Sequence, residues 1–333
     1  MNETFVPAPD ARLPWHAATW ARFAGSSARD SVAHALLIHG EGGLHKLHLG
    51  RQIGRALLCA SPVEDGQACG RCKSCLLLRA GTHPDWIEVT PEDSAVIKID
   101  QIRALSERLS MRPQIAQRQV AIIWPAERMN PAASNALLKT LEEPAGDTHL
   151  LLVCDRIGRL SATIRSRCQR LPVAPLAGTE GDAALSAVAK VDVLRAHAAL
   201  SLSNGDPEAA LSVLQAAVWT EWLQLAERLR QLAAGTLAAG AFGALYAKDG
   251  GRLLQRWSEL IGFATRAEPV GIAPLDALSG LTSAGEMSRL LPLATQLERA
   301  RGLLGSGVRE DLLVYELSCR WAELSMSKRD RRA

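Results

Sequence analysis

The sequence GEGGLHKL at residues 40–47 decides the fold, because it has the outline of a phosphate-binding loop without all of its chemistry. Such a loop follows the pattern G-x-x-x-x-G-K-[ST]. Its glycines let backbone N–H groups surround phosphate oxygens, its lysine meets the phosphates, and its hydroxyl holds magnesium. Gly40 and Lys46 fit this pattern, whereas His45 replaces the second glycine and Leu47 replaces the hydroxyl residue. We therefore expect the loop to persist as structure without its magnesium ligand.

The sequence on either side of this loop predicts an α/β domain. ALLI at 35–38 is a short apolar strand, and residues 46–58 have the apolar spacing of a helix. Further strands are expected at 86–89, 120–124, 149–154 and 169–171, and further helices at 100–110, 131–143 and 161–166. Apolar strands separated by helices are typical of a parallel sheet that is covered on both faces.

The chain after this domain is predicted to be helical. Two prolines and two glycines interrupt the alternation at residues 172–181, and the rest is rich in alanine and leucine. We expect a core at residues 1–172, a small helical domain at 173–215 and a longer helical domain at 216–333. Four tryptophans at helical spacing favour a place in the core over stacking on bases: Trp219, Trp222, Trp257 and Trp321.

The composition is that of a globular protein. Of 333 residues, 47% are hydrophobic and 22% are charged. No apolar run approaches the ~18 residues of a membrane helix, and nothing at residues 1–10 resembles a signal peptide, so we expect a cytoplasmic protein without a membrane partner. The net charge of +3 is too small to indicate nucleic-acid binding by itself.

Four cysteines close together predict a metal site. Cys69, Cys72 and Cys75 are spaced by two residues and follow Cys59, which lets four thiolates converge on one tetrahedral ion. Structural zinc is favoured over an iron–sulfur cluster, because LLLR at 76–79 does not continue as C-x3-C-P. Thiols without a metal remain the other alternative. With four protein ligands such a site is closed, so its expected role is to fold the module at 59–80.

A second motif of ATP hydrolysis is also missing. A hydrolysing enzyme needs an acidic pair at the end of the strand beside the loop. We take that strand to be VAII at 120–123, and it is followed by Trp124 and Pro125. Glu127 comes too late and is interpreted as a solvated loop carboxylate. Hydrolysis by this chain is therefore not expected, and residual nucleotide binding through Lys46 stays open.

Several stretches together resemble one family. NALLKTLEEP at 135–144 is similar to the N-A-L-L-K-x-L-E-E-P helix of bacterial clamp-loader AAA+ subunits, and SRC at 166–168 is similar to their S-R-C motif. The cysteine module at 59–80 resembles the zinc insert of the same subunits. THPD at 82–85 and IDQIR at 99–103 also match. The resemblance covers most of the first half, and the second half matches only in length and layout.

This resemblance implies a fold and a function. The fold is an AAA+ P-loop core with a parallel sheet, then an all-α lid and an all-α collar that joins five subunits in a ring. Within the DNA polymerase III holoenzyme, such rings load the sliding clamp onto primed DNA during replication. The degenerate motifs resemble a subunit that does not hydrolyse ATP and works with tau/gamma motor subunits and the delta subunit. The arginine of S-R-C crosses to a neighbour's ATP, so Arg167 is the expected arginine finger.

Two other functions remain open at this point. The first is a divergent but active AAA+ motor ATPase, which the absence of a magnesium-binding hydroxyl at Leu47 disfavours. The second is a stand-alone zinc-dependent DNA-binding protein that uses Arg71, Lys73 and Arg79 around the cysteine module. These three charges are few, and a solvated face explains them as well.

Overall fold

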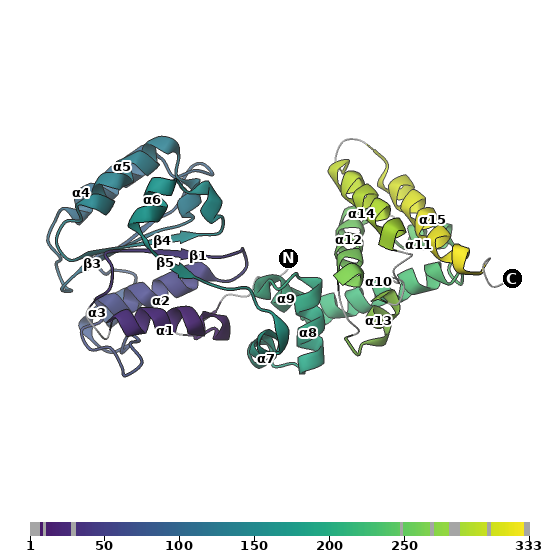
Figure 1. The fold of residues 1–333 in the computed structure, drawn as a ribbon, viewed down its shortest axis with the longest axis horizontal. Coiled ribbons are helices and arrows are strands. Elements are labelled where there is room, and N and C mark those ends of the chain that lie inside the picture. The colour runs from purple at the N-terminus through teal and green to yellow at the C-terminus, as the bar shows by residue number, and fades with distance from the viewer. Residues whose placement is uncertain are drawn as a thin grey trace. The chain divides into compact units, whose positions relative to one another are not determined.

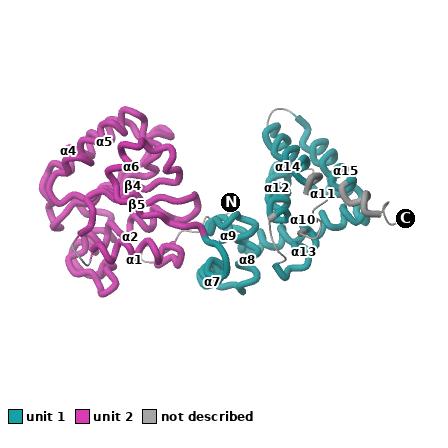
Figure 2. The backbone as a smooth tube through the Cα atoms, in the orientation of Figure 1, with its two compact units in different colours: residues 1–4, 176–333 teal, residues 5–175 magenta. Residues whose placement is uncertain are grey.

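The computed structural model describes residues 7–8, 11–27, 31–246, 249–266, 270–279, 287–304 and 308–329. The described residues form two compact units, which divide between Pro175 and Leu176 (Figure 2). The unit of residues 5–175 is α/β and the unit that begins at Leu176 is helical, so the predicted fold class is confirmed. The expected boundary between a lid and a collar near residue 215 remains a prediction.

A five-stranded sheet forms the centre of the α/β unit, and every neighbouring pair of strands is parallel. The order across the sheet is β2-β3-β4-β1-β5. The strands are β1 (Ala35–His39), β2 (Trp86–Val89), β3 (Gln119–Ile123), β4 (Thr148–Cys154) and β5 (Gln169–Pro172). Strand β4 therefore lies between β1 and β3. Our expectation that residues 120–123 lie directly beside the strand of the loop is wrong.

Helices cover both faces of this sheet (Figure 1). Three lie on one face: α1 (Ala17–Ser27), α2 (Lys46–Leu58) and α3 (Lys73–Arg79). Three lie on the other: α4 (Ile99–Leu109), α5 (Pro131–Glu142) and α6 (Ala162–Arg167). Short 3-10 helices occur at η1 (Pro14–His16), η2 (Ala126–Arg128) and η3 (Ile157–Arg159). The helix α3 lies within the cysteine module and was not expected.

Successive side chains of a buried strand point to opposite faces of the sheet, which explains why helices pack on both faces. In β1, Leu36 and Ile38 pack in the cluster that contains α2, whereas Leu37 packs with α4 and α5. All three side chains are at most 1% exposed. Each fully buried leucine or isoleucine favours folding by about 1.5–3 kcal/mol. Strands with apolar residues on both faces therefore require helices on both sides.

Local capping fixes the ends of the helices that carry the site. Asn130 accepts the backbone N–H of Ala133 at 2.7 Å, and Pro131 occupies the first turn of α5. Ser161 accepts the N–H of Ile164 at 3.2 Å and so begins α6. These side-chain acceptors satisfy N–H groups that have no partner within the helix.

The helical unit, which begins at Leu176, contains no strand among its described residues. The four tryptophans predicted for its core are buried: Trp219, Trp222, Trp257 and Trp321. The Trp321 indole N–H donates to the carbonyl of Leu229 at 2.9 Å. The helices are α7 (Gly178–Ala189), α8 (Val193–Leu202), α9 (Pro207–Val213), α10 (Ala216–Ala233), α11 (Ala239–Leu245), α12 (Gly250–Arg266), α13 (Ala273–Ser279), α14 (Met287–Gly302) and α15 (Glu310–Arg329). Within the described residues, none of the helices has the length and apolar character of a membrane span.

Candidate functional site

The loop at residues 40–47 joins β1 to α2, as a phosphate loop does. His45 stands where the motif has its second glycine, and its φ of 51° lies in the left-handed region. A side chain at such a φ is strained, which is why glycine is favoured there. The backbone has therefore kept the shape of the motif although the residue has changed.

The Lys46 ammonium is already paired inside the protein. Its side chain is 1% exposed, and its Nζ lies 2.7 Å from a carboxylate oxygen of Asp155. The ammonium also donates to the backbone carbonyl of Glu41. Asp155 directly follows β4, the neighbour of β1 in the sheet. Lys46 therefore has a carboxylate and a carbonyl oxygen where a working loop offers it phosphate oxygens.

The 3-10 helix η1 covers the loop from the outside. The Trp15 indole N–H donates to the carbonyl of Leu44 at 3.2 Å, and His16 Nε2 lies 2.7 Å from the same oxygen. The rings of Trp15 and His45 have centroids 6.3 Å apart. Burial lowers the pKa of His16 and that of His45 to about 4, so both rings are neutral near pH 7. The cover adds no positive charge that would attract phosphate.

Gly40 has a packing role in this structure. A Cβ at this position would lie 2.4 Å from the backbone carbonyl oxygen of Val173, which is closer than real contacts allow. The N–H of Val173 donates to the carbonyl of His39 at 2.8 Å and holds the two segments together. The close approach of two backbones therefore explains the glycine without a ligand.

The end of β3 carries no acidic pair, because Trp124 and Pro125 follow it. Glu127 lies in η2 and is partly buried. One of its carboxylate oxygens accepts the backbone N–H of Asp155 at 3.1 Å, and the other is buried without a partner. The interpretation of Glu127 as a solvated loop carboxylate is therefore wrong. The side chain turns inward to the end of β4.

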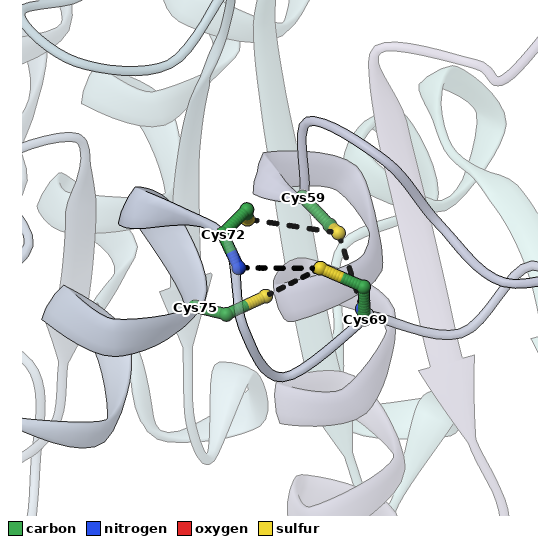
Figure 3. A group of neighbouring side chains, drawn as sticks. All are labelled: Cys59, Cys69, Cys72 and Cys75. Atoms are coloured by element: carbon green, nitrogen blue, oxygen red, sulfur yellow. Dashed lines mark hydrogen bonds between the residues drawn. The ribbon is translucent and has the colours of Figure 1, made fainter.

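The four cysteines Cys59, Cys69, Cys72 and Cys75 form one cluster, with all sulfurs within 4.8 Å of one another (Figure 3). The Cys59–Cys72 and Cys69–Cys75 sulfur distances are 3.9 and 4.0 Å. Zinc–sulfur bonds of about 2.3 Å in a tetrahedron place sulfurs about 3.8 Å apart. The cluster could therefore hold a metal ion such as zinc.

Local backbone geometry builds this cluster. Cys59 directly follows α2, Cys72 directly precedes α3, and Cys75 lies inside α3. The N–H of Cys69 points to the sulfur of Cys59 at 3.2 Å. Backbone N–H groups, that of Arg71 first, lower the pKa of Cys69 to about 6, and burial raises the pKa of Cys75. A divalent cation among the sulfurs would favour the thiolate form of all four.

Arg167 is the last residue of α6, where a position just after the helix was expected. Its Nη2 lies 2.5 Å from a carboxylate oxygen of Glu142, the last residue of α5. Its Nη1 donates to the carbonyl of Thr163 at 3.2 Å. The Arg167 side chain is 35% exposed and that of Glu142 is 49% exposed. The guanidinium is thus held on one side and open to solvent on another.

The THPD stretch at 82–85 has a structural role. The Asp85 carboxylate is buried and accepts the backbone N–H groups of residues 114, 115 and 116 at 2.7 to 2.8 Å. Although burial alone would raise it, these donors hold the pKa of Asp85 below its usual value. Asp85 therefore fixes the turn that leads into β3.

Sequence reasoning found the loop, the cysteines and Arg167, but missed Asp155 and Glu142 as their partners. One signal for Asp155 was present, since a carboxylate that ends a buried strand lies at the same edge of the sheet as the loop. Nothing in the sequence distinguishes Glu142 from Glu143 as the partner of Arg167. Both partners became visible only once the strands and helices were placed.

Comparisons with known proteins agree on one family. Residues 15–177 match the family model described as DNA polymerase III, delta subunit. The chain is 39% identical over 229 residues to DNA polymerase III subunit delta' of Pseudomonas aeruginosa, which covers 68% of each chain. It is 32% identical over 340 residues to that subunit of Yersinia pestis, which covers 92% of this chain and 94% of the relative.

A tau/gamma subunit and a solved structure also match. DNA polymerase III subunit tau/gamma of Haemophilus influenzae is 30% identical over 147 residues, which covers 44% of this chain and 21% of the relative. The crystal structure of a gamma subunit-related protein from Thermotoga maritima aligns with a TM-score of 0.44 and 17% identity. That alignment covers 91% of this chain and 99% of the other.

Proposed function

This chain belongs to the delta' subunits of the DNA polymerase III clamp loader, and we propose that it hydrolyses no ATP itself but donates Arg167 to a neighbouring ATPase subunit. One contrast carries the proposal. The basic residue of the chain's own loop, Lys46, is buried and paired, whereas Arg167 is partly exposed at the end of a helix.

The state of the loop supports the first part of the proposal. Leu47 offers no hydroxyl to magnesium, and Trp124 offers no carboxylate. A phosphate that approached Lys46 would have to displace Asp155 from a buried ion pair.

The chemistry of Arg167 supports the second part. An arginine presents five N–H donors in a planar fork and keeps its charge at every pH a cell meets. Two of its nitrogen atoms contact Glu142 and Thr163, and the side chain remains one-third exposed. A guanidinium placed against a γ-phosphate stabilises the charge of the transition state, which accelerates hydrolysis on the order of 10³- to 10⁵-fold at that site.

The decisive experiment is the DNA-stimulated ATPase of a reconstituted clamp loader that contains Arg167→Ala. We expect a large loss of the rate contributed by the facing ATP site, with assembly of the complex unchanged. Arg159→Ala, which removes an exposed arginine of η3 in the same unit, is the matched control and should leave the rate near wild type. An Arg167→Ala complex with wild-type ATPase and wild-type DNA stimulation would refute the role in trans.

The alternative of an active motor makes an opposite prediction for the isolated chain. An active motor turns over ATP by itself and loses that turnover on Lys46→Ala. We expect no turnover by the isolated chain and no measurable binding of a fluorescent ATP analogue.

We propose zinc as the ion of the cysteine cluster, with a structural role. All four ligands come from the protein, and their spacing suits a tetrahedron. Metal analysis should give about one zinc per wild-type chain and much less for Cys72→Ser, with Ser61→Ala as a control near the cluster. The rival role, zinc-dependent DNA binding by the isolated chain, would appear as salt-dependent binding of single-stranded DNA that is lost in Cys72→Ser.

We also propose the partners that family membership implies. These are the tau/gamma motor subunits and the delta subunit in a five-subunit ring, with the collar at residues 216–333 as the joining domain. The ring would act on the sliding clamp and on primed DNA in the cytoplasm. Co-purification of this chain with tau/gamma and delta, and its loss when residues 216–333 are removed, would test the arrangement.

A further inference from the structure

Glu142, which pairs with Arg167, lies on a helix that is packed as tightly as the helix of Arg167. Glu142 ends α5 and Arg167 ends α6. Leu141, beside Glu142, is 2% exposed, and Ile164 of α6 is fully buried in the same hydrophobic cluster. The backbones that carry the carboxylate and the guanidinium are therefore fixed by packing, and only the two side chains extend toward solvent.

Two oxygen atoms restrict the arginine side chain. Arg167 Nη2 forms an ion pair with the Glu142 carboxylate at 2.5 Å. Arg167 Nη1 donates to the carbonyl of Thr163, one turn back on α6, at 3.2 Å. An arginine has several rotatable bonds and samples many rotamers when nothing holds it. These contacts limit its guanidinium to one region and leave its remaining N–H groups available.

We propose that Glu142 is a positioning residue for Arg167, which holds the guanidinium in the orientation that a neighbouring subunit's phosphate meets. This inference rests on the proposed function, since it needs Arg167 to act in trans. Preorganised donors stabilise a transition state without first having to be oriented. A carboxylate that supports a functional arginine from behind serves this purpose when its own backbone is rigid.

The ion pair between Glu142 and Arg167 contributes little to the stability of the fold. Both side chains are more than one-third exposed, and ion pairs of that kind contribute little to stability. Glu143, the next residue, is also exposed and has no side-chain hydrogen bond or ion pair among the described residues. Glu142 and Glu143 are neighbours in the sequence, but only Glu142 contacts Arg167, so the contact identifies Glu142 as the positioning residue.

The test compares variants in the reconstituted clamp loader by their ATPase kinetics. Glu142→Ala should lower kcat by about two- to fivefold, the size expected from an exposed ion pair, and leave the KM for ATP unchanged. Glu142→Gln keeps an acceptor oxygen at the same place and should retain more of the rate. Glu143→Ala is the matched control and should behave as wild type. Thermal unfolding and assembly of Glu142→Ala should equal those of wild type.

A double variant separates positioning from an independent effect. In a complex that carries Arg167→Ala, adding Glu142→Ala should change kcat no further, because there is no side chain left to position. A loss of the same factor in both backgrounds would overturn the inference. Wild-type or increased kcat for Glu142→Ala, with Arg167→Ala impaired, would overturn it too and leave the proposed function intact. No effect of Arg167→Ala would instead refute the proposed function.

Discussion

Replacing Asp155 by alanine removes the only carboxylate that pairs with the buried ammonium of Lys46 among the described residues. The Glu41 carbonyl would then be the remaining partner of that charge. Removing one member of a buried ion pair costs about 3–5 kcal/mol, because the other charge stays desolvated. Asp155 is 34% exposed, so water can reach part of the gap. We therefore expect the lower end, about 3 kcal/mol.

The reverse substitution should be much milder. Lys46→Met removes the buried charge and leaves a carboxylate at Asp155 that can face water. Because Asp155 is 34% exposed, water can solvate its charge better than it can solvate the buried ammonium, so a smaller loss than that of Asp155→Ala is expected. The double variant Lys46→Met with Asp155→Ala should recover most of the stability lost in Asp155→Ala.

Amide hydrogen exchange measures this loss for the α/β unit alone. Amides of β1 and β4 exchange through global opening of the unit, so a loss of about 3 kcal/mol accelerates their exchange about 100-fold. Peptides from α10, in the other unit, serve as an internal reference. Asp147→Ala, which removes an exposed carboxylate just before β4, is the matched control. Equal acceleration by Asp147→Ala and Asp155→Ala, or by Lys46→Met and Asp155→Ala, would refute the reasoning.

Three further changes test the same unit, each by exchange in its central strands. Asp85→Ala removes the buried acceptor of three backbone N–H donors and should cost about 1–3 kcal/mol. Because the folded pKa of Asp85 is lowered, wild type should also lose stability as pH falls below 3.8. With the pKa of His16 lowered from 6.5 to about 4, stability should fall as pH drops between these values, and His16→Phe should reduce that slope. Gly40→Ala should cost about 1–3 kcal/mol by its clash with Val173, whereas Gly42→Ala, with nothing within 4 Å, should not.

Most elements of the α/β unit could be predicted from the sequence, because apolar runs and helical spacing depend on neighbouring residues. The helix at residues 46–58 has the predicted bounds, and the strands differ by a residue or so at their ends. The order of the strands could not be predicted. In a parallel sheet each crossover helix can carry the chain past one or more strands. That is how β4 comes to lie between β1 and β3.

The site was predictable where its residues are close in sequence. The cysteines follow this rule, since a tetrahedral site depends on short spacings. The unexpected helix α3 arises because Cys72 precedes a run, Lys73–Arg79, that is long enough for two turns. Contacts between distant segments, such as Lys46 with Asp155, depend on strand order and were missed for that reason.

Lys46 and Arg167 differ in what a phosphate would have to displace. At Lys46 it must displace Asp155, the carboxylate that already compensates a fully buried charge. At Arg167 the pair with Glu142 is partly exposed and can stay in place, because other N–H groups of the guanidinium remain available. Electrostatics within the chain therefore favour phosphate binding at Arg167 over phosphate binding at Lys46. This preference follows from the burial and pairing of Lys46 and does not depend on the missing magnesium ligand.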